Sequence, residues 1–165
     1  MFWRRSRADF VKGKGDGNRT AMRRLVKSGE IPGILAYRGK IPLGWCAVAP
    51  RECYPALGRS RILKPLDEKP VWSISCLFVK KECRGQGISV ALLKAVITHV
   101  RRQGGAILEG YPVEPRKGRM PDAFAWTGLA SAFRQAGFRE CARRSPTRPV
   151  MRAFLAGNAD RKTPS

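Results

Sequence analysis

The amino-acid sequence predicts a mixed α/β domain built on one central sheet. Two strand-like runs flank a short glycine turn, which predicts an antiparallel hairpin. Further along, an apolar run, a glycine-rich turn, an amphipathic segment and a second apolar run follow one another. This order predicts a strand, a helix and a strand joined in a right-handed parallel crossover.

The first residues are basic and rich in glycine. Residues 1–17 end in Gly13-Lys14-Gly15-Asp16-Gly17, which nearly matches a phosphate-loop pattern. Asn18 stands where that pattern needs a glycine, and no strand pattern precedes it, so we expect a flexible lead-in. Asn18 is a suitable cap for a helix over Arg19–Ser28, which Gly29 would end.

The hairpin comes next. Gly33–Tyr37 and Pro42–Ala49 are strand-like, and the turn Arg38-Gly39-Lys40 between them has a central glycine. Pro50 ends the second strand. Arg51–Leu57 predicts a short helical turn.

The crossover occupies the middle of the chain. Val71–Val79 is mostly apolar, which favours a strand buried on both faces. After Arg84-Gly85-Gln86-Gly87, a helix is predicted over Ile88–Gln103, because four apolar residues share one face: Leu93, Val96, Ile97 and Val100. Gly104 and Gly105 end this helix, and Ala106–Tyr111 predicts the second strand.

The C-terminal part predicts a helix over Leu129–Ala136 and an antiparallel pair of strands, Phe138–Arg143 and Val150–Leu155. We expect a single domain over residues 18–155. Residues 156–165 are expected to form a disordered tail.

The chain is strongly positive: 33 Lys and Arg against 12 Asp and Glu give a net charge of +21. Such a charge is typical of proteins that bind nucleic acid. The excess is spread over the whole chain, which a solvated basic surface explains as well. A nucleic-acid-associated protein therefore stays an alternative function. A membrane partner is not expected, since no run approaches the roughly 18 to 20 apolar residues of a membrane span.

The cysteine pattern bears on metal binding and on the cell compartment. The five cysteines include no Cys-x-x-Cys pair, and His99 is the single histidine, so we expect no metal site. The odd count and the cysteines within apolar runs favour a reducing compartment, the cytoplasm.

The glycine turn is the first candidate site. The first N–H groups of a helix lack partners within it, and the helix dipole adds partial positive charge. Two glycines let the backbone approach an anion, so a phosphate or pyrophosphate is the natural ligand, with Arg84 and Ser89 adding contacts. No Gly-Lys-Ser/Thr follows and a third glycine is missing, so the turn alone fits a plain tight turn equally well.

The ordered set of elements resembles the GNAT N-acetyltransferase superfamily, over about Ala21 to Leu155. The apolar strand, Arg-Gly-x-Gly and amphipathic helix are similar to its coenzyme-A core. Gly44-Trp45-Cys46 is similar to its hairpin, and Ala132–Phe138 to its final helix with a Gly-Phe. The sequence segments Trp45–Glu52 and Glu109–Val113 also resemble those of a bacterial GNAT subgroup whose substrates are mostly unassigned.

The resemblance implies a GNAT-like mixed sheet, acetyl-CoA as the cofactor, and a small-molecule or peptide amine as the acceptor. The amine would attack the thioester directly, and a backbone N–H near Phe78 would stabilise the oxyanion. The crossover strands would splay apart to admit the cofactor. Backbone groups implied to pair with its pantetheine arm are those of Leu77, Phe78 and Val79. Residues implied to hold its pyrophosphate are Arg84, Gly85, Gln86, Gly87, Ile88 and Ser89.

The chain departs from the family at its catalytic positions. Phe133 stands where many relatives carry a Tyr acid, and Trp72-Ser73 where many carry a Glu. Glu109 and Tyr111 lie two apart on one strand and so face the same side, which makes them substitute candidates: Glu109 as base, directly or through water, and Tyr111 as acid or orienting group. A structural role for both stays open. A non-catalytic acyl-CoA-binding module is therefore another alternative.

The N-terminus also departs from the family, because only one clear helix precedes the hairpin. A missing first strand would leave a sheet edge open, so we expect a homodimer. The loop 112–126, with Trp126, is expected to shape the acceptor site. The positive charge disfavours polycationic acceptors at long range.

Overall fold

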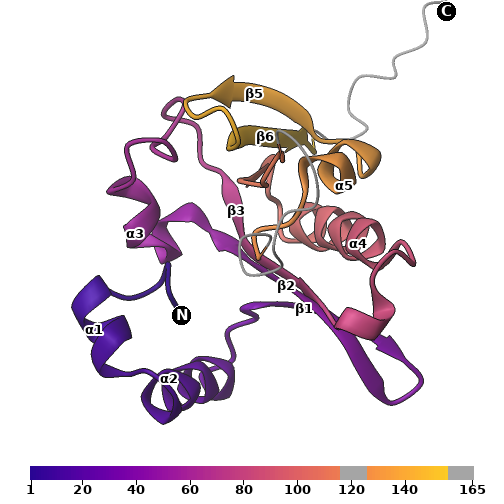
Figure 1. Cartoon of the computed structure of the whole chain (residues 1–165). Helices are drawn as coiled ribbons and strands as arrows, with labels where there is room; N and C mark the ends of the chain where they lie inside the picture. Colours follow the sequence, from indigo (N-terminus) through magenta and orange to yellow (C-terminus); the bar gives the residue numbers. More distant parts are fainter. Residues whose placement is uncertain (116–125, 156–165) are drawn as a thin grey trace, which may run out of the picture.

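A computed structural model of the chain describes residues 1–115 and 126–155. In this part, six strands form one sheet in the order β1-β2-β3-β4-β6-β5 (Figure 1). The pairing of β3 with β4 is parallel, and the other four pairings are antiparallel. The predicted mixed sheet is confirmed.

The hairpin forms as predicted, with β1 at Gly33–Arg38 and β2 at Ile41–Pro50. Gly39 turns the chain with a φ of +59°, in the left-handed region that favours glycine. After Pro50 the chain forms a 3-10 turn at Arg51–Cys53 and the short helix α3 at Pro55–Gly58. These match the predicted helical turn.

The crossover is confirmed as well. The strand β3 spans Trp72–Val79, a 3-10 turn spans Lys81–Cys83, α4 spans Ile88–Arg102, and β4 spans Ile107–Gly110. The helix α4 ends as its glycine signal predicts, since Gly104 has a φ of +77°.

The strands β3 and β4 pair along only part of their length, from Trp72 with Leu108 to Ile74 with Gly110. Past that point the chain's own residues 126–129 lie between β3 and the segment that follows β4. The Leu77 N–H donates to the Trp126 carbonyl at 2.8 Å, and the Val113 N–H donates to the Gly128 carbonyl at 2.8 Å. The two strands therefore diverge toward the end of β3 that leads into α4.

The C-terminal elements are α5 at Ala130–Gln135, β5 at Arg139–Arg143 and β6 at Pro149–Phe154. The predicted antiparallel pair is confirmed, and β6 lies between β4 and β5. The predicted tail, residues 156–165, lies outside the described residues.

The N-terminal segment differs from the sequence prediction. Residues 1–17, for which a flexible lead-in is expected, contain helix α1 at Arg7–Lys12, and the Ser6 side chain caps it by accepting from the Asp9 N–H at 3.0 Å. Trp3 packs against buried residues on one face of the sheet. Regular structure therefore begins well before residue 18, which corrects the expected start of the domain.

The second helix, α2, spans Asp16–Lys27 and begins three residues before the predicted start. Asn18 does not cap it. Its side-chain amide donates to the Phe10 carbonyl at 2.9 Å, and its oxygen accepts from Arg5 Nη1 at 2.7 Å. These bonds connect α2 to the preceding segment, and they occupy the side-chain groups of Asn18 that a helix cap would use.

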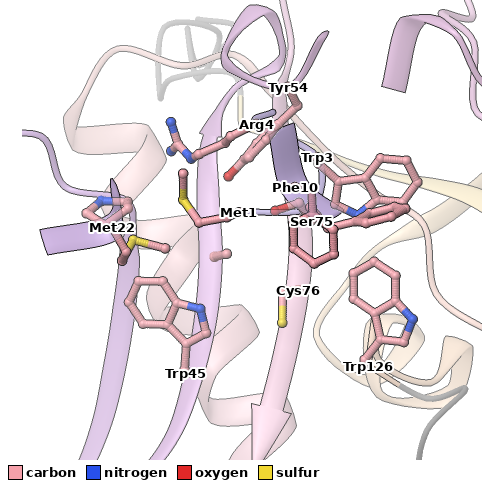
Figure 2. Close-up of a pocket in the computed structure, with 13 residues that line it drawn as sticks. Met1, Trp3, Arg4, Phe10, Met22, Trp45, Tyr54, Ser75, Cys76 and Trp126 are labelled. Carbon is pink, nitrogen blue, oxygen red and sulfur yellow. The ribbon is translucent and has the colours of Figure 1, made fainter. Parts of the chain in front are cut away.

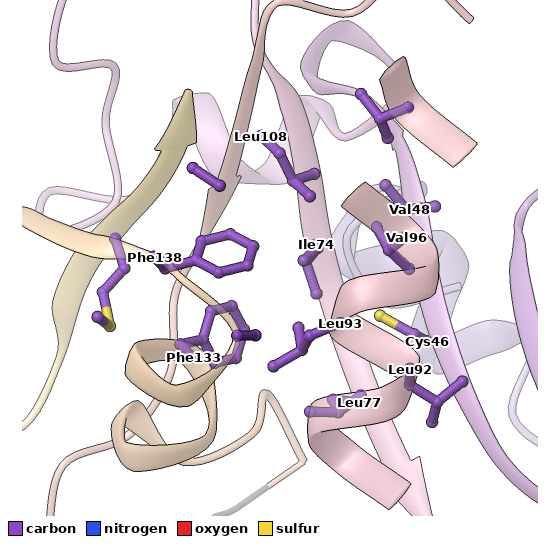
Figure 3. Packing of buried hydrophobic residues seen from close by; sticks show 14 of the residues in the cluster. Cys46, Val48, Ile74, Leu77, Leu92, Leu93, Val96, Leu108, Phe133 and Phe138 are labelled. Carbon is purple, nitrogen blue, oxygen red and sulfur yellow. The ribbon is translucent and has the colours of Figure 1, made fainter. Parts of the chain in front are cut away.

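Alternate residues of β2 face two separate cores. Cys46 and Val48 pack with Leu93 and Val96 of α4 and with Ile74 of β3, in the larger core (Figure 3). The smaller core lies on the opposite face; its buried members are Ala49, Tyr54, Leu57, Leu63, Tyr111 and Val150. This alternation follows from the two-residue period of a strand, and it fixes which side chains face α4 and which face the N-terminal helices.

One edge of the sheet is β1, and within residues 1–115 and 126–155 no strand precedes it. This agrees with the expected absence of a first strand. In the described part of the chain, none of the helices has the length and apolar character needed to cross a membrane.

Candidate active site

The glycine turn between β3 and α4 has the geometry of an anion site. Gly85 and Gly87 have φ values of +74° and +76°, and Gly87 is the N-cap of α4. Within the described residues no side chain caps this helix, so the backbone N–H groups of its first turn, which includes Ile88 and Ser89, have no partner within the helix or from a capping side chain. A Cβ built on either glycine would meet nothing within 4 Å, which shows that the turn is open.

The polar side chains of the turn hold its shape. Arg84 Nε donates to the Val79 carbonyl at 3.1 Å. Gln86 donates to the Glu82 carbonyl at 3.1 Å and accepts from Arg38 Nη2 at 3.0 Å. Since the Gln86 side chain is engaged in this way, its available group for an anion is the backbone N–H.

The structure places the three predicted pantetheine contacts directly before this turn. Leu77 and Val79 are buried, whereas Phe78 is 51% exposed. The Leu77 N–H, which lies on the side of β3 away from β2, is bonded to the Trp126 carbonyl. A cofactor arm that pairs with Leu77 would replace this bond.

A bulge lies next to these residues on β3. Ala47 of β2 pairs with Cys76, but Val48 pairs with Ile74, so Ser75 is an extra residue in β3. A bulge bends its strand and redirects backbone groups, and bulges are frequent next to active sites.

A cavity of about 260 Å³ opens beside the bulge (Figure 2). Ser75 and Cys76 line it from β3, and Trp45 and Ala47 line it from the face of β2 opposite α4. Most of its remaining wall is aromatic, and the aromatic residues that line it in the described part of the chain are Phe2, Trp3, Phe10, Trp45, Tyr54 and Trp126. The rings of Phe2, Trp3, Phe10 and Trp126 pack on one another, with the Trp3 and Trp126 centroids 5.9 Å apart.

Sequence reasoning found only part of this cavity. Trp126, from the loop predicted to shape the acceptor site, lines its wall, and residues 116–125 of that loop lie outside the described residues. Phe2, Trp3 and Phe10 were missed because their segment was expected to be flexible. The available signal was the presence of these large apolar side chains in an otherwise basic segment.

Glu109 and Tyr111 lie together, as their spacing predicts. Tyr111 donates to Glu109 Oε1 at 2.7 Å, and Arg51 Nη1 donates to both side chains, at 2.5 Å to Tyr111 and 2.9 Å to Glu109. Arg152 Nε donates to Glu109 Oε2 at 2.7 Å. Ser73 Oγ lies 2.9 Å from the Tyr111 oxygen.

This network is closed to an acceptor. Glu109 and Tyr111 are each 1% exposed. Both Glu109 oxygens accept from a guanidinium, so the carboxylate is already engaged within the network. Burial and the neighbouring Glu109 charge raise the pKa of Tyr111. The geometry therefore does not support the expected roles of Glu109 as base and Tyr111 as acid, and it favours a structural role for both.

The family's usual acid position is apolar here. Phe133 is fully buried and packs edge-to-face on Phe138, with the ring centroids 4.9 Å apart. A Cβ at Gly110 would come within 2.2 Å of the Phe133 ring, so this phenyl group fills the space above β4. It supplies packing and no proton.

A sequence model of the acetyltransferase (GNAT) family matches residues 4–112. That match covers the N-terminal helices, the hairpin, the glycine turn and the crossover. The chain belongs to the GNAT acetyltransferase family. Membership makes it an N-acetyltransferase that uses acetyl-CoA as cosubstrate.

Solved structures of GNAT proteins share the fold at low sequence identity. A putative GNAT acetyltransferase from Desulfovibrio desulfuricans is 19% identical with a TM-score of 0.55, and the match covers 88% of each chain. The ribosomal-protein-alanine N-acetyltransferase of Brucella melitensis is 18% identical with a TM-score of 0.53, over 85% of this chain and 78% of that one.

A further similar structure is yncA of Salmonella typhimurium, a putative acetyltransferase solved with acetyl-CoA. It is 15% identical with a TM-score of 0.52, over 90% of this chain and 76% of that one. No curated protein matches the chain significantly.

Proposed function

We propose that this GNAT protein moves the acetyl group of acetyl-CoA to an amine of a small-molecule or peptide acceptor by direct attack on the thioester. The observation that carries the proposal is the position of Gly87. It is a left-handed glycine at the uncapped start of the 15-residue helix α4, four residues after the 3-10 turn that follows β3. This is where a helix N-terminus can bind a pyrophosphate.

In this proposal the backbone N–H groups of residues 84–89 hold the pyrophosphate. The open space around Gly85 and Gly87 fits an anion that approaches the backbone closely. Lys80, Lys81 and Arg84 lie along the same turn and add positive charge next to it. The diverging strands then lead from this turn toward the bulge at Ser75.

The backbone of Leu77, Phe78 and Val79 is proposed to pair with the pantetheine arm. The Leu77 N–H already makes a strand-like bond, with the Trp126 carbonyl as acceptor. The proposal requires the Trp126 backbone to withdraw and to release this N–H to the cofactor. Residues 126–129 therefore lie in the space that the arm would occupy.

When bound, acetyl-CoA supplies an activated acetyl group, and the acceptor amine must be neutral to attack it. The cavity beside the bulge favours that form. Among the described residues, its lining is mostly apolar and includes the cation of Arg4 but no carboxylate. An amine placed there is desolvated and lies near a like charge, and both effects lower its pKa.

Glu109 and Tyr111 are proposed as positioning residues. Their network joins β3, β4 and β6 through Ser73, Glu109 and Arg152 at the end where β3 and β4 still pair. The network keeps the two strands together at that end, so they diverge only toward the glycine turn. They act on catalysis through the position of β3 and do not touch the acceptor.

Two assays in parallel test the proposal. We expect acetyl-CoA to raise the melting temperature of the protein, and a panel of primary amines to include at least one that releases coenzyme-A thiol at a rate proportional to enzyme. Binding without thiol release from any amine would favour the non-catalytic acyl-CoA-binding module. Absence of any thermal shift at millimolar acetyl-CoA would overturn the proposal. Steep, salt-dependent retention on RNA would favour the nucleic-acid alternative.

We also propose that the protein forms a homodimer through β1. The strand is a sheet edge, and three large apolar residues on or next to it are about half exposed: Leu35 at 47%, Tyr37 at 56% and Ile41 at 59%. An open edge with exposed apolar side chains is a template for pairing with another strand.

A reducing compartment, the cytoplasm, is proposed as the site of action. The support is that all five cysteines, Cys46, Cys53, Cys76, Cys83 and Cys141, are free thiols, two of them fully within the core. Burial raises the pKa of Cys46 and Cys76, so these thiols stay protonated and unreactive at neutral pH.

A further inference from the structure

The aromatic cavity beside the bulge contains unpaired polar groups. Within residues 1–115 and 126–155, the buried side-chain polar atoms without a hydrogen-bond partner are Trp3 Nε1, Arg4 Nη2 and Tyr54 Oη. All three residues line this one cavity. Buried polar atoms in folded proteins are nearly always satisfied, so three such atoms at one cavity make it a candidate site for a polar ligand group.

The chemistry of these atoms defines one end of that ligand. The indole and guanidinium nitrogens only donate hydrogen bonds, and a phenol can donate as well. Arg4 has a cationic guanidinium, and its side chain is only 10% exposed. Its other terminal nitrogen, Nη1, lies 3.5 Å from Glu30, whose side chain is 51% exposed. Donors of this kind with one cation fit a carboxylate.

Arg4 and Tyr54 form a single wall of the cavity. The Arg4 guanidinium lies over the Tyr54 ring, 4.9 Å from its centroid. Figure 2 shows these two side chains together on one side of the cavity, with Trp45 and Trp126 away from them. Arg4 and Tyr54 thus make one side of the cavity polar, and Trp3 continues from it to Trp126, on which it stacks.

The apolar side defines the rest of the ligand. Trp45, Trp126 and Met22 offer flat or flexible apolar surface and no charge. A volume of about 260 Å³ is slightly below the roughly 300 to 1,000 Å³ of pockets that enclose drug-sized ligands. The space suits one amino-acid-sized molecule better than a folded peptide or an oligosaccharide.

We propose that the acceptor of this enzyme is a free α-amino acid with an aromatic side chain. Its carboxylate is bound by Arg4, Trp3 and Tyr54, its ring lies against Trp45, and its amino group lies beside the bulge at Ser75. The inference rests on the proposed acetyl transfer and names the substrate class of the same site. A polycationic acceptor is disfavoured, since the lining within residues 1–115 and 126–155 has a cation and no carboxylate.

Binding is measured without turnover by tryptophan fluorescence. Three of the four tryptophans, Trp3, Trp45 and Trp126, line the cavity, so a ligand there changes the emission. With excitation at a wavelength that phenylalanine does not absorb, we compare L-phenylalanine, phenethylamine and L-alanine in the presence of coenzyme A. L-phenylalanine is expected to bind at least tenfold more tightly than either of the others, because each of those lacks one of the two recognised groups.

The variant Arg4→Met separates recognition from folding. It is expected to weaken L-phenylalanine binding at least tenfold and to change phenethylamine binding less than twofold. Arg7→Met is the matched control, since Arg7 is exposed, is close in sequence and does not line the cavity. The control is expected to change neither affinity.

Turnover distinguishes this inference from the proposed function. With acetyl-CoA, we expect N-acetylation of L-phenylalanine, with a kcat/KM that falls at least tenfold in Arg4→Met. If acetyl-CoA does not bind, the proposed function fails. If acetyl-CoA binds but polyamines or aminoglycosides react faster than aromatic amino acids, or no aromatic amino acid reacts, the inference is overturned and the proposed function is not. Equal loss of L-phenylalanine and phenethylamine binding in Arg4→Met would also overturn it.

Discussion

The backbone N–H of Leu77 donates to the backbone carbonyl of Trp126 at 2.8 Å. This bond joins the C-terminal half of β3 to a segment that follows β4 by more than a dozen residues. It occupies a donor that the cofactor is proposed to use, and it places the Trp126 side chain in the wall of the aromatic cavity. Under the proposed function, Trp126 therefore borders the cofactor site through its backbone carbonyl and the aromatic cavity through its side chain.

The first prediction concerns movement of Trp126. Adding acetyl-CoA is expected to change the tryptophan fluorescence of the protein, because the Trp126 backbone must leave Leu77. Trp126→Phe is expected to lose most of this change. Trp72→Phe is the control, since Trp72 lies at the other end of β3, in edge-to-face contact with His99. An undiminished change in Trp126→Phe would show that this residue stays in place.

The second prediction concerns the buried Glu109 network. Glu109→Gln removes the charge that two guanidinium groups share, and it is expected to lower the free energy of unfolding by about 3 to 5 kcal/mol. Glu114→Gln is the control, because Glu114 also pairs with two arginines, Arg134 and Arg143, but is 30% exposed. Glu114→Gln is expected to lower the free energy of unfolding by less than about 1 kcal/mol. Urea unfolding at pH 7 measures both, and equal losses would contradict a buried, closed network.

The third prediction concerns stability at low pH. Arg134 and Arg143 lower the pKa of Glu114, and Arg143 lowers that of Glu140. A carboxyl with a lowered pKa in the folded state stabilises the protein above its ordinary pKa of about 4.3, and this contribution is lost as the pH falls through the lowered value.

The urea midpoint should accordingly fall below about pH 4.3, and a Glu114→Gln/Glu140→Gln double variant should show a shallower fall. Some fall should persist, because Arg152 likewise lowers the pKa of Asp67. A double variant with the same pH dependence as the parent would mean that these ion pairs do not form in solution.

The fourth prediction concerns the open edge of the sheet. Sedimentation at micromolar concentration is expected to show a dimer. Leu35→Lys is expected to shift it toward monomer, since a lysine on an edge strand opposes edge-to-edge pairing. Phe154→Lys is the matched control, because Phe154 is similarly exposed, at 58%, and lies on β6, an interior strand of the sheet. A parent protein that sediments only as monomer would exclude the proposed interface.

The hairpin and the crossover could be predicted because their signals are local. Gly39, Gly87 and Gly104 each mark a turn at the place where the structure has one, and the apolar period of α4 lies within a single segment. The start of α2 could not be predicted in the same way. The side chain of Asn18 is bonded to Phe10 and Arg5, eight and thirteen residues away, and a capping rule considers only the next few residues.

The candidate site was predictable to a similar degree. The glycine turn is a contiguous motif, so its residues could be named from the sequence. The partners of Glu109 could not, because Arg51 and Arg152 lie 58 and 43 residues from it in the chain. Burial of a carboxylate between two cations depends on how β4, β6 and the turn after β2 pack together in the fold. A short sequence motif does not predict such long-range contacts.

Calorimetric titration with acetyl-CoA tests the central claim most directly. Gly87→Glu places a side chain and a negative charge at the helix start, where φ is +76°, and Gly104→Glu places the same side chain at the other end of α4, where φ is +77°. Because both sites are open and equally strained, the two variants should lose similar stability. The account predicts that the parent and Gly104→Glu bind acetyl-CoA with the same affinity and that Gly87→Glu shows no binding. Unchanged binding by Gly87→Glu would contradict it.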